Sequence, residues 1–330
     1  MEAMRDWAAQ GGKVSPLKLL SSSTSPTIVR ATSGRLMTME LVTSELLAAD
    51  GDSCNWGSVS LSEGQMGVRF NLMGAEQAAV VMGWWAMPEL VDAIRREARY
   101  SEAAAWALVG DSMEYHSSIE IAWRALHKLR AWGELERLQV VEYNAGVGVM
   151  SRAMAQLDDR VQLVVAAECW DVARRVLRRL HGEELLMPVW SHTAETAAQI
   201  MAAVPEPAVC IYSWECRPYA GRNRQGTLSS DERASKIEPN LAELASVIEG
   251  WRELRPKVIV VENVGRLTQT FVLAHVWERA CGMLTSMEGY EWEHTVLQPE
   301  ADLDGLCART RLFAYGWRTR GTMAQERRRR

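Results

Sequence analysis

A cysteine and a glutamate follow two apolar runs of the sequence at the points where the runs end. Cys216 comes three residues after the run 208–213, and Glu262 comes directly after the run 257–261. A thiolate can add to one carbon of an electron-poor ring while a carboxyl group interacts with a ring nitrogen. Either residue alone would be interpreted as structural, because most cysteines in a reduced protein are small core hydrophobes and most strand-end glutamates are solvated.

Two further signals lie upstream, at the ends of two other apolar runs. Residues 142–148 read Glu-Tyr-Asn-Ala-Gly-Val-Gly before a helical pattern, and Glu168 closes the next run. Glycines at a strand-to-helix turn let a ligand approach the backbone, where helix N–H groups face it. An acidic residue at the next strand end can accept hydrogen bonds from ribose hydroxyls. By itself, the glycine-rich motif is as common in turns that bind no ligand as in turns that bind one. The two signals together favour a nucleoside cofactor.

The elements that must position these residues are short apolar runs that alternate with amphipathic segments. Continuous apolar runs of this length are what parallel strands buried on both faces require, so the second half predicts a doubly wound α/β sheet with ligands at the carboxyl ends of its strands. The runs are 138–143, 161–167, 186–190, 208–213, 257–261, 292–297 and 312–315, and the helices between them include 172–180 and 241–254. Upstream, the patterns predict short strands at 27–31 and 36–41 and helices at 75–82, 88–109 and 117–129.

Composition sets limits on the class of protein. The chain has 330 residues, of which 48% are hydrophobic, and its longest apolar stretches are far shorter than the roughly 20 residues that span a bilayer. The first 20 residues lack the apolar core of a secretory signal, so we expect no membrane association and an intracellular protein, nuclear if the source is eukaryotic. The six cysteines form no CxxC or Cys/His cluster, which argues against disulfides and against a metal site.

Charge argues against nucleic-acid binding as a whole but not locally. The formal net charge is −5, whereas phosphate neutralisation normally shows as an excess of Lys and Arg. Arg217, Arg222, Arg224 and Arg233 nevertheless gather in one segment, and residues 327–330 are all arginine. The segment favours a local basic face, while the short terminal run is more typical of a solvated tail.

The order of these motifs resembles the cytosine-C5 methyltransferases. The Asp-Leu-Phe-Ala-Gly-x-Gly-Gly turn of that family is matched by residues 142–149, and its acidic residue after the second strand by Glu168. Its Pro-Cys-Gln-Pro-Phe-Ser-x-x-Gly loop is matched loosely by residues 215–221, and its Glu-Asn-Val triplet residue for residue by 262–264. In place of Gln-x-Arg-x-Arg the chain has Cys307-Ala308-Arg309-Thr310-Arg311.

Two motifs that close the family's sequence come first in this chain. Residues 72–78 and 82–84 resemble the Leu-Thr-x-x-Glu motif and its trailing Gly-Phe-Pro, and residues 110–113 resemble the Gly-Asn-Ser-Val motif beside the cofactor. We therefore expect a circularly permuted chain, and a join of this kind is tolerable because chain ends often lie close together. The expected parts are 1–68 as an irregular remnant of the target-recognition region, 69–133 as the helical segment, 134–320 as the Rossmann-like catalytic domain and 321–330 as a basic tail.

The resemblance implies a class I S-adenosylmethionine-dependent methyltransferase fold and methyl transfer to C5 of cytosine in DNA. Cys216 would add to C6, Glu262 would engage N3 and the exocyclic amine, and Arg309 and Arg311 would hold the base and nearby backbone. The implied S-adenosyl-L-methionine site comprises Tyr143, Asn144, Ala145, Gly146, Gly148, Glu168, Gly110, Asp111 and Ser112. The small recognition region predicts salt-sensitive, weakly selective DNA binding or the help of a partner protein.

Departures from the family pattern leave alternatives open. Glu215 replaces the proline before the nucleophile and should raise the pKa of the thiol, whereas Arg217 in place of glutamine should lower it. The usual Asp after the third strand is replaced near Ser191-His192. A catalytically impaired relative that binds cofactor or nucleic acid is one alternative, and a tRNA cytosine methyltransferase is another. A small-molecule methyltransferase is disfavoured, because it needs neither the cysteine nor the Glu-Asn-Val triplet.

Overall fold

The chain divides into two compact units, Met1–Val80 and Val81–Arg330. In the first unit, the computed structural model describes residues 27–30, 36–43 and 66–72. In the second it describes 82–319 except 83–85, 98–104, 106–107, 110–111, 134, 189–198, 201, 205, 217, 220–229, 270 and 304–309.

The first unit contains an antiparallel sheet in the order β1-β2-β3. Its strands are β1 (Thr27–Arg30), β2 (Leu36–Thr43) and β3 (Met66–Leu72). Thr27 pairs with Met39, which in turn pairs with Phe70 on the other side. The two short strands predicted upstream are confirmed, and β3 is an additional strand that the sequence analysis did not predict.

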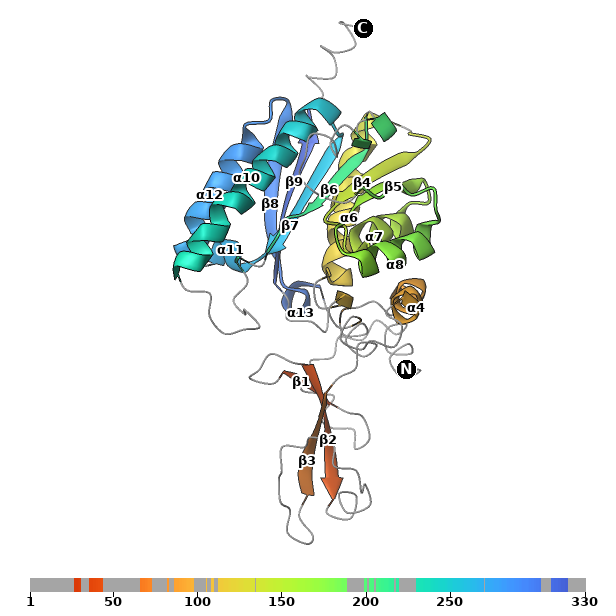
Figure 1. Ribbon diagram of the computed structural model, residues 1–330, viewed down its shortest axis with the longest axis vertical. Helices are drawn as coiled ribbons and strands as arrows, with labels where there is room; N and C mark the ends of the chain where they lie inside the picture. The colour runs from red at the N-terminus through yellow and green to blue at the C-terminus, as the bar shows by residue number, and fades with distance from the viewer. Residues whose placement is uncertain are drawn as a thin grey trace, which may run out of the picture. The chain divides into compact units, whose positions relative to one another are not determined.

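The second unit is built on a six-stranded mixed sheet with the order β5-β4-β6-β7-β9-β8 (Figure 1). Strands β5, β4, β6 and β7 are parallel, and β9 runs antiparallel between β7 and β8. This confirms the predicted doubly wound α/β class and agrees with the class I methyltransferase arrangement. The strands are β4 (Leu138–Tyr143), β5 (Val161–Ala167), β6 (Val209–Ser213), β7 (Val258–Val264), β8 (Tyr290–Leu297) and β9 (Arg311–Arg318).

Helices cover both faces of this sheet, because alternate residues of the central strands are apolar on each side. Val141, Cys210 and Tyr212 belong to a buried cluster with α10 and α12, while α6 packs against α7 and β7. None of the helices in the described part of the chain is long and apolar enough to cross a membrane. The helices are α4 (Pro88–Glu97), α6 (Tyr115–Leu129), η3 (Arg130–Trp132), α7 (Val149–Leu157), α8 (Asp171–His181), α10 (Ser230–Leu254), α11 (Arg266–Gln269), α12 (Phe271–Thr285) and α13 (Pro299–Asp302).

Three details correct the sequence analysis. The run 186–190 forms no named strand in its described residues, although Leu186 makes a parallel bridge to Val165 and accepts the N–H of Ala166. Strand β8 is not buried on both faces, because it lies at the sheet edge and all its residues except Leu297 are partly buried or exposed. The helix predicted at 88–109 begins as α4, which ends at Glu97; beyond it only three further helical residues are described.

The segment before β4 is attached to the sheet by charged and aromatic contacts. On one side, Lys128 at the end of α6 lies 3.3 Å from the centroid of the Trp317 ring on β9. On the other side, Arg152 of α7 and Arg179 of α8 each lie 2.7 Å from a carboxylate of α4, those of Glu89 and Glu97. Helices α4 and α6 therefore pack with the strands and helices that follow them.

We expect loss of the Trp251 ring to destabilise this unit severely. Trp251 is fully buried and lies edge-on to Tyr143 and Tyr212, with ring centroids 6.3 and 6.1 Å away. Trp251→Ala should lower the free energy of unfolding by about 3–5 kcal/mol, because it removes apolar contacts and leaves a cavity. Trp123→Ala is the matched control, since that side chain is 52% exposed. Denaturant unfolding measures both, and equal effects would contradict the assigned core.

Candidate active site

The turn after β4 adopts a backbone conformation that favours glycine. Asn144, Gly146 and Gly148 have φ values of 50°, 55° and 73°, in the left-handed region that most side chains avoid. At Gly148 a Cβ atom would also lie 3.1 Å from Leu177, so the turn packs closely against α8. At Gly146 the nearest atom to such a Cβ is 3.8 Å away, which leaves the backbone there approachable.

Glu168 ties the end of β5 to this turn. Its Oε2 accepts the N–H of Gly146 and its Oε1 accepts the N–H of Trp170, both at 2.7 Å. Bonds to a carboxylate are stronger than neutral ones, so this buried side chain fixes the spacing of the two strand ends. Each oxygen keeps further acceptor capacity, because an ionised carboxylate offers about four lone-pair sites.

The segment before α6 reaches the same turn. The atom nearest to a Cβ placed on Gly146 is the Oγ of Ser112. That hydroxyl donates to the carbonyl of Leu108 at 2.6 Å, which fixes the end of the preceding helical stretch. Ser112 and the turn are thus neighbours although 34 residues separate Ser112 from Gly146. Gly110 and Asp111 lie outside the described residues.

Glu142 lies on β4 beneath the turn and is fully buried. Burial raises the pKa of its carboxyl group to about 7, and the charge of Glu168 adds to the shift, while the hydroxyl and N–H of Ser151 partly offset it. Among the described residues, neither oxygen has a hydrogen bond of normal geometry. Glu142 belongs to the glycine-turn motif, but the sequence analysis did not predict a role for it. An acidic residue inside the apolar run 138–143 is the feature of the sequence that could have indicated one.

The loop that carries Cys216 is held by β7 and α10. Trp214 donates its backbone N–H to the carbonyl of Glu262 at 3.1 Å, and its indole N–H to the carbonyl of Asn240. The Asn240 amide donates to the carbonyl of Glu215, and the N–H of Tyr219 closes the turn onto the carbonyl of Cys216. Cys216 is therefore half-buried on a fixed turn.

Glu262 and Arg311 form a buried ion pair at the edge of the same loop. Arg311 Nε lies 2.7 Å from Glu262 Oε1, and less than a tenth of either side chain is exposed. Glu262 is the last residue of β7 that pairs with β6, and its partner there is Ser213. The side-chain amide of the next residue, Asn263, donates to the carbonyl of Trp214. The structure thus places Cys216, Glu262 and Arg311 at one edge of the sheet, whereas Arg309, Arg217 and Cys307 lie outside the described residues.

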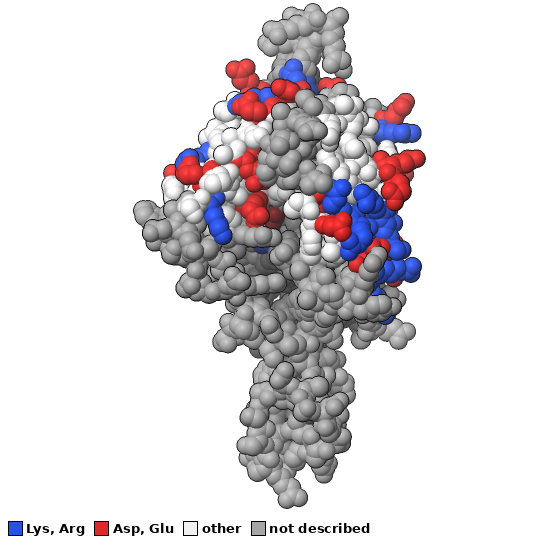
Figure 2. Space-filling model, viewed as in Figure 1, with Lys and Arg blue, Asp and Glu red and all other residues white. Residues whose placement is uncertain are grey.

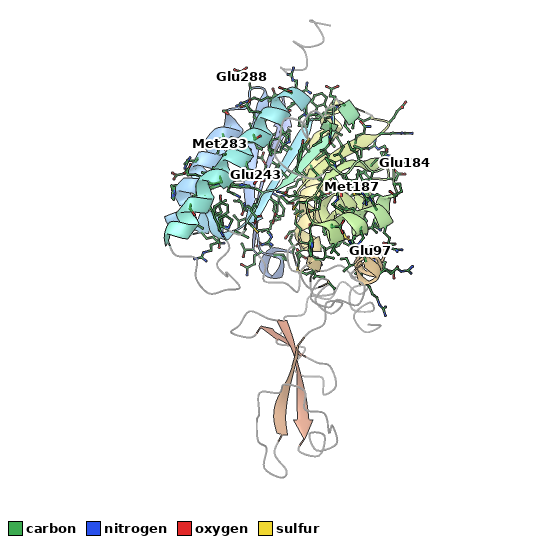
Figure 3. All side chains as sticks on the ribbon, in the orientation of Figure 1. Glu97, Glu184, Met187, Glu243, Met283 and Glu288 are labelled. Atoms are coloured by element: carbon green, nitrogen blue, oxygen red, sulfur yellow. The ribbon has the colours of Figure 1, made fainter. Side chains whose placement is uncertain are left out.

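A shallow groove of about 610 Å³ lies between this loop and α10. Asn144 connects it to the glycine turn, because its amide donates to the carbonyl of Ser213 at 3.1 Å and to Glu243 of α10 at 3.4 Å. Glu243 is labelled on α10 in Figure 3. No motif of the sequence pointed to Glu243 or Asn240, since both depend on how α10 packs. The groove is lined by Glu215, Pro218, Ser235, Lys236, Pro239, Asn240, Ala242, Glu243 and Ser246.

The described residues contain no group of three or more His, Cys, Asp or Glu side chains placed to hold a metal ion. Cys210 lies on β6 and is fully buried, and burial raises the pKa of its thiol. Of the cysteines described, Cys216 is the one in the loop after β6, which the N–H of Trp214 ties to the carbonyl of Glu262.

No family model matches the chain, and no curated protein is similar to it at a significant level. Solved structures are similar in part, and the aligned region spans about half of the first two. The Dnmt2 methyltransferase of S. pombe is 18% identical over 55% of this chain and 49% of its own, with a TM-score of 0.40. The methyltransferase EhMeth of Entamoeba histolytica is 17% identical over 56% and 54%, with a TM-score of 0.41.

A third structure, the precorrin-6y C5,15-methyltransferase of Geobacter metallireducens, is 16% identical over 61% of this chain and 88% of its own, with a TM-score of 0.35. At these identities and TM-scores the similarities carry no information about substrate. The contacts within the site must therefore support any proposal about function.

We expect the Glu142 carboxyl group to make stability depend on pH. Between about pH 4.5 and 7 the folded chain keeps this proton while the unfolded chain releases it, so its contribution to stability falls as pH rises through this range. Glu142→Gln should remove that slope and be more stable than the natural chain at pH 8, by a few kcal/mol at most. Thermal melts at several pH values measure this, with exposed Glu288→Gln as control; parallel curves for all three chains would contradict it.

Proposed function

We propose that Val81–Arg330 is an S-adenosylmethionine-dependent methyltransferase acting on C5 of cytosine in DNA. The observation that carries the proposal is the buried Glu262–Arg311 pair beside the half-buried Cys216 loop. These groups share the carboxyl edge of the sheet with the turn at Gly146 and with Glu168, where α/β sheets bind ligands. A nucleophile, a carboxylate and a nucleoside-type site would then serve one reaction.

The residues present fit the proposed cofactor. Glu168 offers acceptors that suit ribose hydroxyl donors, and the open backbone at Gly146 suits close approach of a ligand. Tyr143, Asn144, Ala145, Gly148 and Ser112 complete the described part of the proposed site, with Gly110 and Asp111 as further members. When bound, S-adenosylmethionine supplies an electrophilic methyl group on its sulfonium.

The chain's own residues would prepare the cytosine ring. The Cys216 thiolate forms a bond to C6 while Glu262 contacts N3 and the exocyclic amine, so electron density moves onto C5. Once C5 carries the methyl group, a base would take the C5 proton, and the electron pair of the C5–H bond would form the C5–C6 double bond. Sulfur would leave C6 as the thiolate, with the electrons of the carbon–sulfur bond. Arg311, held against Glu262, would fix the carboxylate, and Arg309 would contact the base or nearby backbone. The base must leave the duplex, at a cost of a few kcal/mol.

The position of Ser112 supports the proposed circular permutation. A motif that closes the family's sequence would have to reach the glycine turn from before β4, and Ser112 does lie beside Gly146. The helix α6 then leads directly into β4 through η3. We likewise propose that residues 1–68 and 321–330 are what the chain retains of a target-recognition region, and that a partner protein supplements them.

One observation favours the catalytically impaired alternative. Glu215 precedes Cys216 where the family has proline, and its backbone carbonyl accepts the amide of Asn240, so the backbone at this position is fixed. An acidic residue next to the nucleophile is a departure from the family's pattern. A tRNA substrate is the other alternative, because the same residues would perform the same chemistry on RNA. Tritiated methyl transfer to DNA and to tRNA, measured side by side, separates the three outcomes; transfer to tRNA alone would overturn the proposal of a DNA substrate.

We expect Cys216→Ser to abolish covalent trapping on DNA that contains 5-fluorocytosine. Trapping requires the bond to C6, which the serine hydroxyl does not form at a useful rate, whereas cofactor binding should change less than about threefold because Cys216 is not part of that site. Denaturing gels measure the trapped complex, and calorimetry measures cofactor binding.

The matched control is Cys281→Ser, which alters another half-buried cysteine, on α12. It should trap DNA as the natural chain does. Trapping that survives in Cys216→Ser but is lost in another cysteine variant would assign the nucleophile elsewhere.

A further inference from the structure

Arginines gather on the outer side of α4 and α8, where Figure 2 shows the densest blue region of that view. This region, termed the α4–α8 face, is distinct from the loop arginines that the sequence analysis singled out. Its members are Arg95 and Arg96 on α4, Arg174, Arg175, Arg178 and Arg179 on α8, and the adjoining Arg152 on α7, which pairs with Glu89 of α4.

The spacing along α8 forces these side chains outward. Ala173, Val176 and Leu177 are fully buried against the rest of the unit. Arg174 and Arg175 precede Arg178 and Arg179 by four residues, which is slightly more than one turn and about 6 Å along the helix axis. Of these two pairs, Arg178 and Arg179 are exposed, while Arg174 and Arg175 are partly buried.

The seven arginines of this face outnumber the five carboxylates that pair with them. Asp92 pairs with Arg96 at 2.9 Å, Glu89 with Arg152 at 2.7 Å and Asp171 with Arg175, while Glu97 is shared by Arg175 and Arg179, at 3.4 and 2.7 Å. Arg178 lies 3.9 Å from Glu183, whose side chain is 89% exposed, and Arg174 donates to a backbone carbonyl, that of Glu168. A guanidinium has five donors, and exposed ion pairs are weak, so an incoming phosphate can join or replace these partners.

We propose that the α4–α8 face binds the phosphate backbone of duplex DNA outside the catalytic site. The choice of DNA as the ligand rests on the proposed function. The existence of the basic face does not, because it follows from the positions of the arginines. Through Arg174 the face begins at the carbonyl of Glu168, so it is continuous with the proposed cofactor edge. Each DNA strand presents a phosphate every 3.4 Å of helix axis, a density that two guanidinium pairs about 6 Å apart can meet. In a chain of net charge −5, such binding requires a segregated basic surface.

The test measures DNA binding by the full chain without cofactor, using fluorescence anisotropy of a labelled duplex at several salt concentrations. Arg96→Ala with Arg178→Ala removes two exposed arginines that do not hold α4 to α8, with side chains 61% and 43% exposed. Affinity at low salt should fall about tenfold or more, and the slope of log affinity against log salt should decrease by about two. Arg252→Ala with Arg279→Ala is the matched control, 40% and 50% exposed, and should change neither.

Three results would overturn the proposal: no duplex binding by the full chain, equal losses in both double variants, or tighter binding of a folded RNA that depends on Arg96 and Arg178. Thermal melting confirms that each variant is folded. Protection of Arg178, but not Arg279, from phenylglyoxal by bound duplex is a second measurement on the natural chain, and equal labelling with and without DNA would count against the face. Neither assay requires methyl transfer. If the natural chain binds duplex without transferring methyl groups, and Arg96→Ala with Arg178→Ala weakens that binding, the face is retained and the proposed function is rejected.

Discussion

The ion pair between Glu262 and Arg311 connects the last parallel strand to the antiparallel strand beside it, at the edge where the other strands end. Removing two charges from water is costly, and a buried charge that loses its partner typically destabilises a protein by about 3–5 kcal/mol. Each residue therefore constrains the other. Because the carbonyl of Glu262 also accepts the N–H of Trp214, the same strand end fixes the beginning of the Cys216 loop. The position of the proposed nucleophile thus depends on the pairing of β7 with β9.

Buried parallel strands were predictable because their signal is local. The runs 138–143 and 161–167 coincide with β4 and β5, whose residues must be apolar on both faces. The direction of β9 was not predictable from its run, since an apolar segment does not state which neighbour it pairs with. In the first unit, β3 alternates apolar residues with Gly67, Arg69 and Asn71. This pattern of period two is typical of a strand and could have predicted β3.

The candidate site was predictable only to the extent that motif order could identify it. Cys216, Glu262 and Glu168 each follow an apolar run within three residues, so their placement at one end of the strands followed from the α/β topology. The approach of Ser112 to Gly146 depended on the resemblance, because no local pattern brings a segment before α6 to a turn after β4. The contacts of Asn240 and Glu243 depend on the packing of α10, which begins at Ser230, earlier than its apolar pattern indicated, and contains Pro239.

Exposed carboxylates mark the edge strand β8, which has a neighbour on one side only. This strand and the turn before it expose Glu288, Glu291 and Glu293. Exposed charges on an edge strand discourage pairing with a strand of another molecule. The sheet therefore ends at β8 and is discouraged from continuing into a neighbouring molecule.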